Sequence, residues 1–222
     1  MLDQAGFVEI TCRDEQKEEI GKALVREMLK VYAGPLDIEI DDYLMERASE
    51  GICELKYTKS GIYAELLDHY EASHILFGGG MYPCWYTYED ALKALLARYP
   101  DISLRAGISI SDPYSSDHYE FYESKDGMLI RKLAARCTCC EQVFDLRAGV
   151  YPYEDIEELR EGFVFPKDYV SEHLGICSLN CAKKLAEDPT CDAFELLEDI
   201  EAEGDSIEHI IEHYLENHPE EK

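Results

Sequence analysis

Alternating apolar and polar residues in the first third of the chain predict strands beside a helix. The segment GFVEITCR (6–13) alternates as a half-buried strand does. Apolar residues at i, i+4 spacing then predict a helix that starts at Asp14 as its N-cap and runs to about Tyr32, where AGP stops it. Residues 52–69 fit either a pair of strands or a strand and a short helix, with a turn at Ser60-Gly61.

A second helix and a run of strands follow. Thr87 and Asp90 have the pattern of a capping box for a helix over 88–99, which Pro100 ends. Three alternating segments joined by turn-like sequences come next: 102–111, 117–124 and 127–135. The first 135 residues therefore predict an α+β fold, in which helices pack on an antiparallel sheet.

The stretch from Trp85 to about residue 130 resembles the YubB-type ferredoxin-like domains. The shared features are a Trp, a helix, a Tyr-Pro-Asp stop and strands that end in a Gly turn. The resemblance implies a ferredoxin-like sandwich and carries no established activity.

Five of the nine cysteines fall in two short clusters, CTCC (137–140) and CSLNC (177–181). The amino terminus has neither the basic start nor the apolar stretch of a secretory signal, so we expect a reducing cytoplasm, where disulfides are rare. Clustered thiols in that compartment favour metal binding. The predicted ligands of a structural Zn²⁺ ion are Cys137, Cys140, Cys177 and Cys181.

The spacing of these ligands predicts a turn followed by a helix. The first pair has the spacing of a zinc knuckle, and Ser178 is a plausible N-cap that places the second pair at the first turn of a helix. ICSLNCAKKL resembles the ligand helix of TRASH and YHS-type fingers, which implies a treble-clef zinc module over 137–190. Two features depart from that family: 36 residues separate the pairs, and Glu141 stands where a knuckle commonly has Gly. Cys139 could replace Cys137 or Cys140 as a ligand.

Other candidate sites have simpler interpretations. HIIEH (209–213) matches the letters of an inverted metalloprotease motif, but its histidines are expected on a solvent face and we interpret it as a chance match. FGGGM (77–81) lacks the rest of a phosphate-binding loop and indicates a turn. The remaining cysteines are interpreted as small packed side chains: Cys12, Cys53, Cys84 and Cys191.

The carboxyl-terminal residues 191–222 contain 12 acidic residues and one basic residue, Lys222. Their apolar positions are periodic, which predicts two packed helices: one capped by Thr190 and stopped at Gly204, the next starting after Ser206. We therefore expect an α+β sandwich over 1–135, a zinc module over 136–190 and an acidic helical tail packed on that module.

Composition limits the function. A formal net charge of −27 disfavours direct nucleic-acid binding, and no apolar run is long enough to span a membrane. The 16 tyrosines, three of them with the only Trp in residues 81–90, indicate either a binding surface or core packing. We expect a non-catalytic cytoplasmic protein that binds another, basic protein, as bacterial immunity proteins bind toxins. The alternatives are a hydrolase or transferase of unknown substrate and a metal sensor; the oligomeric state is not specified.

Overall fold

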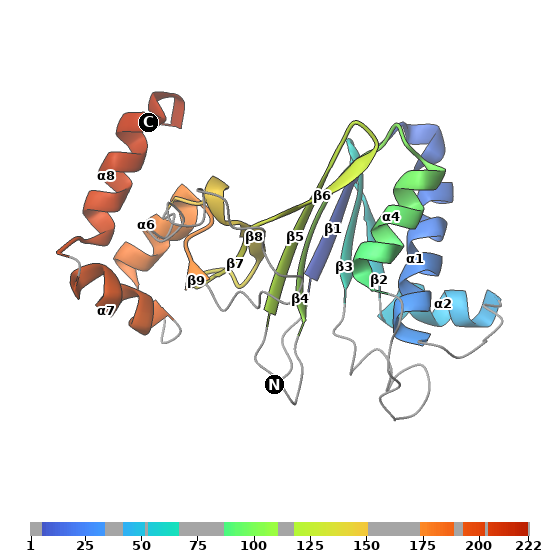
Figure 1. Cartoon of the computed structure of the whole chain (residues 1–222), viewed down its shortest axis with the longest axis horizontal. Helices are drawn as coiled ribbons and strands as arrows, with labels where there is room; N and C mark the ends of the chain where they lie inside the picture. Colours follow the sequence, from blue (N-terminus) through green and yellow to red (C-terminus); the bar gives the residue numbers. More distant parts are fainter. Residues whose placement is uncertain are drawn as a thin grey trace, which may run out of the picture. The chain divides into compact units, whose positions relative to one another are not determined.

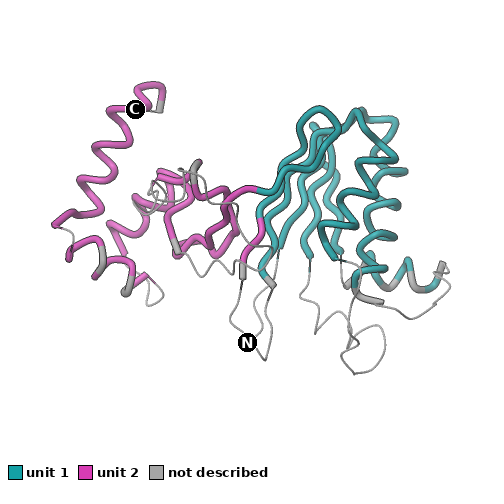
Figure 2. Tube along the Cα trace, viewed as in Figure 1, with its two compact units in different colours: residues 1–115, 121–131 teal, residues 116–120, 132–222 magenta. Residues whose placement is uncertain are grey.

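The chain divides into two compact units with separate hydrophobic cores (Figure 2). The computed structural model describes residues 6–33, 42–51, 53–66, 87–110, 118–150, 174–188, 193–202 and 204–221. Unit 1 comprises residues 1–115 and 121–131, and unit 2 comprises residues 116–120 and 132–222. The tail beyond residue 190 therefore belongs to the same unit as both cysteine clusters.

Unit 1 is built around a six-stranded sheet. Its strands, in chain order, are β1 (Gly6–Thr11), β2 (Cys53–Tyr57), β3 (Gly61–Leu66), β4 (Ser103–Ile110), β5 (His118–Lys125) and β6 (Met128–Lys132). They lie in the order β2-β3-β1-β4-β5-β6, and β1 is antiparallel to both of its neighbours. The predicted α+β class is confirmed, and residues 52–69 contain a strand pair rather than a strand and a helix.

Helices cover one face of this sheet. They are α1 (Lys17–Ala33), α2 (Asp42–Gly51) and α4 (Tyr88–Arg98), and Figure 1 shows α1 and α4 side by side on that face. Strand alternation decides which side chains they bury: Val8 and Ile10 of β1 lie in the core with Leu24 of α1, whereas Glu9 is exposed. The capping box of α4 is confirmed, because Thr87 Oγ1 accepts from the Asp90 amide at 3.1 Å and Asp90 Oδ2 accepts from the Thr87 amide at 3.0 Å.

The α-helix α1 begins two residues later than predicted, since an N-cap at Asp14 would make Glu15 the first helical residue and α1 begins at Lys17. Asp14 does not cap the α-helix; it begins a 3₁₀ turn (Asp14–Gln16) whose capping position, Arg13, makes no side-chain cap. The α-helix begins at Lys17, whose ammonium donates to the carbonyls of Thr58 and Lys59 in the β2–β3 turn. This contact joins residues about 41 positions apart in the sequence, so the local sequence around Lys17 does not reveal it.

Unit 2 contains a small sheet followed by three helices. Its strands are β7 (Ala134–Cys137), β8 (Val143–Asp145) and β9 (Leu174–Gly175), in the order β8-β7-β9. A 3₁₀ turn (Leu146–Ala148) follows β8. The helices are α6 (Leu179–Glu187), α7 (Phe194–Ala202) and α8 (Ile207–Asn217), and a final 3₁₀ turn covers Pro219–Glu221. The segment 127–135, predicted as one strand, is divided at Leu133 between β6 and β7, which belong to different sheets.

The acidic tail forms the two predicted helices and packs within unit 2. Ser206 caps α8 by accepting from the His209 amide at 3.3 Å, and Gly204 precedes it with φ of 85°. Apolar residues of α6, α7 and α8 share one core cluster: Ala182, Leu185, Leu196, Ile200, Ile207 and Ile210. Among the described acids of α7 and α8, the exposed ones are Glu198, Glu201, Glu208, Glu212 and Glu216.

Some predictions fall on residues outside the described ranges. They are the FGGGM turn, the aromatic stretch up to residue 86, the cap at Thr190, and the packing of Cys84 and Cys191.

Candidate metal centre

The structure brings the four predicted ligands together. The sulfur atoms of Cys137, Cys140, Cys177 and Cys181, here called the four-cysteine cluster, all lie within 4.8 Å of one another. Cys177 Sγ lies 3.6 Å from both Cys140 Sγ and Cys181 Sγ. Four sulfurs bound to one tetrahedral ion at about 2.3 Å are about 3.8 Å apart, so the cluster has the size of such a site. It can hold a metal ion.

A tight turn after β7 positions the first two sulfurs. Cys137 ends β7, its amide donates to the Gln142 carbonyl at 2.9 Å, and its carbonyl accepts from the Glu141 amide at 2.8 Å. Glu141 has φ of 62°, the left-handed conformation that glycine adopts without cost. The Glu at this position therefore keeps the backbone geometry of a knuckle although it lacks the usual residue.

The start of α6 positions the other two sulfurs. Ser178 is the N-cap, as predicted, and its Oγ accepts from the Cys181 amide at 3.3 Å. Cys177 directly precedes this cap and Cys181 lies in the first helical turn. The positive end of the helix dipole at this point stabilises anionic sulfur.

Backbone contacts hold the two pairs together across the long segment between them. β9 pairs in parallel with β7, matching Cys137 with Gly175. The Thr138 amide donates to the Gly175 carbonyl at 3.1 Å, and the Cys177 amide donates to Cys137 Sγ at 3.5 Å. Thr138 is itself buried, with its hydroxyl 3.3 Å from the same carbonyl. Sequence reasoning missed this role of Thr138, since nothing local distinguishes it from an exposed turn residue.

Burial differs among the four sulfurs. Cys137 is fully buried and Cys181 is 4% exposed, whereas Cys140 lies at the surface. Hydrogen bonds from the thiols of Cys140 and Cys177 lower the pKa of Cys137, because they stabilise its thiolate. The bond to Cys137 raises the pKa of Cys140 to about 12, and bonds to Cys137 and then Cys140 raise the pKa of Cys177. The shifts favour the thiolate at Cys137 and the protonated thiols at Cys140 and Cys177, so a cation that binds to all four sulfurs displaces protons.

Cys139 does not belong to the four-cysteine cluster. Its side chain is partly buried and packs against the hydrophobic core of unit 2. Burial first, and then the proximity of Cys181, raise the pKa of Cys139. The sequence left open an exchange of Cys139 with Cys137 or Cys140; in the structure, Cys137 and Cys140 lie in the cluster and Cys139 does not.

The left-handed backbone at Glu141 gives a testable consequence. Glu141→Gly should leave the stability of unit 2 unchanged or raise it slightly, because relief of the left-handed conformation offsets loss of the 3.1 Å ion pair with Arg136. Glu141→Val should lower it by about 1–2 kcal/mol, since a β-branched side chain is strained there. Chemical denaturation of the two metal-loaded variants measures the difference in their free energies of unfolding. Equal stabilities would contradict the claim that the left-handed backbone at residue 141 favours Gly over Val.

The other candidate residues from the sequence do not come together as a metal or catalytic site in the described part of the chain. His209 and His213 are exposed, and His209 Nδ1 lies 2.7 Å from Asp205 Oδ1 within the same helix end. Within the described ranges, the four cysteines are the one group of three or more Cys, His, Asp or Glu side chains that could share an ion. Cys53 is fully buried, and that burial raises its pKa to about 12, as expected of a packed thiol. Cys12 is only partly buried, and burial raises its pKa as well.

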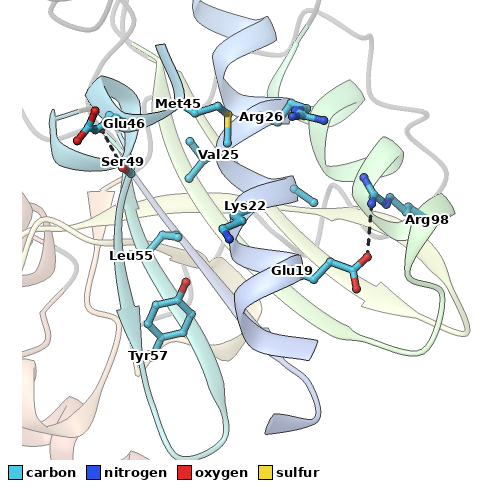
Figure 3. Close-up of a pocket in the computed structure, with 11 residues that line it drawn as sticks. Glu19, Lys22, Val25, Arg26, Met45, Glu46, Ser49, Leu55, Tyr57 and Arg98 are labelled. Carbon is cyan, nitrogen blue, oxygen red and sulfur yellow. Dashed lines mark hydrogen bonds and ion pairs between the residues drawn. The ribbon is translucent and has the colours of Figure 1, made fainter. Parts of the chain in front are cut away.

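Unit 1 has a separate groove of about 580 Å³ above α1, bordered by α2, β2 and the end of α4 (Figure 3). Its apolar side chains include Val25, Met45 and Leu55. Among its charged residues, Arg98 faces Glu19 at 3.4 Å, as the figure shows, and Lys22 pairs with Glu18 at 2.7 Å. Both of these ion pairs are exposed to solvent.

No protein-family model, curated protein or solved structure matches this chain. Across the described residues, no helix combines the length and apolar character that crossing a membrane requires.

Proposed function

We propose that the four-cysteine cluster binds one Zn²⁺ ion whose role is structural. The observation that carries this proposal is the convergence of four sulfurs within 4.8 Å, with near-tetrahedral separations of 3.6 Å between two of the pairs. All-sulfur tetrahedral sites in proteins hold zinc or iron. Bound zinc would have four protein ligands and no position for water, so the residues support a closed site rather than a catalytic one.

The surrounding elements support a treble-clef module. A turn between two antiparallel strands supplies one sulfur pair and the start of a helix supplies the other, which is the arrangement implied by the TRASH and YHS-type resemblance. In unit 1 the order β1-α1-α2-β2-β3-α4-β4, with β1 between β3 and β4, supports a ferredoxin-like sandwich in which α2 is an addition between α1 and β2. The additional strands β5 and β6 extend that sheet beyond β4.

The whole chain, in this proposal, is a non-catalytic cytoplasmic protein that binds another protein through an acidic surface. Its support is the exposed acidic face of the tail helices, formed by Glu198, Glu201, Glu208, Glu212, Glu216 and Glu220. Residues 191–222 contain no basic side chain other than Lys222 and the histidines. A dense negative face attracts a basic partner and speeds association at low salt. Neutralisation of a basic toxin, in the manner of immunity proteins, is one concrete form of this function.

Metal analysis tests the zinc site. The protein purified without added metal should contain one zinc per chain, and Co²⁺ added to the apoprotein should give intense sulfur-to-cobalt bands typical of four thiolates. Weak bands that respond to added anions would indicate three sulfurs and an open position. A coloured protein that contains iron would contradict zinc as the bound metal, but it would still support metal binding by the four-cysteine cluster.

A charge reversal tests the binding surface. The double variant Glu208→Lys/Glu212→Lys should lose a salt-sensitive partner captured from native cytosol, whereas the exposed pair Glu15→Lys/Glu18→Lys in unit 1 should retain it. If both variants captured the partner equally well, the tail helices would not be the binding surface.

Metal sensing is a second candidate, favoured by one observation. Cys140 is exposed, so one edge of the site is open to competing ligands. A sensor requires zinc that exchanges at cellular concentrations; a structural site requires zinc that stays bound during dialysis against a chelator of moderate affinity.

A further inference from the structure

We propose that the outer edge of β2 and the groove beside it bind an extended segment of another protein as an added strand. The segment carries an apolar and an acidic side chain on the face that meets the groove. Both features belong to unit 1, so the proposal is independent of the four-cysteine cluster and of the acidic tail helices.

Strand β2 lies at one end of the six-stranded sheet, and among the described strands only β3 pairs with it. The Thr58 amide donates to the Gly61 carbonyl at 2.9 Å, which makes these two residues a hydrogen-bonded pair. Such pairs alternate along antiparallel strands, so the next residue of β2 that bonds to β3 is Lys56. The amides and carbonyls of Leu55 and Tyr57 therefore point away from β3.

No hydrogen bond joins the outward amides and carbonyls of Leu55 and Tyr57 to any other residue in the described part of the chain. An edge strand whose backbone groups are unpaired is a template for a further strand. An antiparallel segment would exchange two hydrogen bonds with each of these residues, which requires an extended backbone. The edge therefore favours a peptide in the strand conformation over a helix or a compact small molecule.

Leu55 and Tyr57 direct their side chains to the helix-covered face of the sheet, where both line the groove (Figure 3). A Cβ atom at Gly21 of α1 would lie 3.0 Å from Leu55 Cδ1 and from Tyr57 Oη, so both side chains lie against that helix. The side chains of an added strand that lie opposite these two residues point to the same face of the sheet. Alternate side chains of the bound segment therefore meet the groove, where Val25 and Met45 provide apolar contacts.

The charges of the groove favour an acidic residue in the segment. Arg26 is exposed and forms no ion pair with a described residue, whereas the other two cations of the groove each pair with a glutamate of α1. A carboxylate of the segment can pair with the Arg26 guanidinium. Glu46 of α2 also lines the groove and is exposed. The expected segment therefore combines an apolar residue with an acidic one, and a basic residue is accepted beside α2.

A random-peptide library displayed on phage and selected against the full chain supplies the probe. Enriched peptides should share an apolar and an acidic residue at alternate positions. One of them, synthesised with a methyl group on every second backbone nitrogen, lacks the amide donors on one edge of the bound strand. Methylation on the edge that faces β2 should weaken binding about tenfold or more, and methylation on the other edge should leave the affinity unchanged.

Substitutions at the edge of β2 give a matched test on the protein. Tyr57→Pro removes one outward amide and keeps the pairing with β3, since proline is tolerated where the amide faces away from the neighbouring strand. Tyr57→Ala is the control that removes the same side chain and retains the amide. Tyr57→Pro should bind the peptide about tenfold more weakly than Tyr57→Ala does. Arg26→Ala should weaken binding about fivefold and reduce its dependence on salt, whereas Arg105→Ala, which removes an exposed cation of the same sheet, should not.

The proposal is refuted if no peptide is enriched, if both methylation patterns act alike, or if Tyr57→Pro binds as well as Tyr57→Ala does. It is also refuted if the protein alone forms a dimer that Tyr57→Pro abolishes and Tyr57→Ala retains, because the edge would then pair with a second copy of the chain. The methylation experiment uses the unaltered protein, so it decides the question even if a variant does not fold.

Discussion

Replacement of Cys137 by Ser is expected to abolish the cooperative melting of unit 2 and to leave that of unit 1 in place. Cys137 is fully buried, accepts a hydrogen bond from the Cys177 amide and ends the strand that joins both neighbours in the small sheet. Binding of a structural zinc contributes about 10 kcal/mol or more to folding, which is comparable to the whole net stability of a domain, about 5–15 kcal/mol. Unit 1 has its own hydrophobic core and contains none of the four cysteines, so its transition should not require the ion.

Calorimetry of the unaltered protein, of the same protein with a strong chelator and of Cys137→Ser measures this effect. The chelated protein should reproduce the variant. Cys12→Ser is the matched control, because it removes a partly buried thiol of unit 1 that lies far from the cluster in sequence. An unchanged unit 2 transition in Cys137→Ser would contradict a structural role for the metal.

The second large effect is expected at Gly61, where β1 and β3 approach closely. A Cβ atom at Gly61 would lie 1.8 Å from the Ile10 carbonyl oxygen, and both atoms belong to paired backbones that cannot move independently. Gly61→Ala should therefore destabilise unit 1 by about 3 kcal/mol, with a smaller effect on unit 2.

Gly21→Ala is the control for that substitution. Its Cβ would meet the ends of two side chains, Leu55 Cδ1 and Tyr57 Oη, both at 3.0 Å, and Tyr57 is 54% exposed. Those side chains can shift, and alanine favours the helix by about 1 kcal/mol, so its effect on the free energy of unfolding should be small. Equal losses for the two variants would show that the close approach of β1 and β3 does not limit stability.

Local patterns predicted most elements that carry a strong periodicity. The capping box at Thr87 and the N-cap at Ser178 depend on short-range chemistry, which a sequence displays directly. The four ligands were predicted for the same reason: each sulfur pair is set by a turn or a helix start, and two such pairs are sufficient for one ion. The pattern in residues 52–69 left a strand pair and a strand with a short helix open, and the structure has the strand pair.

Long-range contacts account for what the sequence did not predict. Helix α2 (Asp42–Gly51) was missed, and strands β8 and β9 are too short to show a pattern. The break at Leu133 depends on which sheet each half joins. None of these is encoded in spacing along the chain.

X-ray absorption at the zinc edge tests the central claim most directly. Zinc-loaded protein should show four sulfur neighbours at about 2.3 Å and no nitrogen or oxygen in the first shell. A shell with an oxygen or nitrogen atom at about 2.0–2.1 Å in place of one sulfur would contradict a closed site of four cysteines.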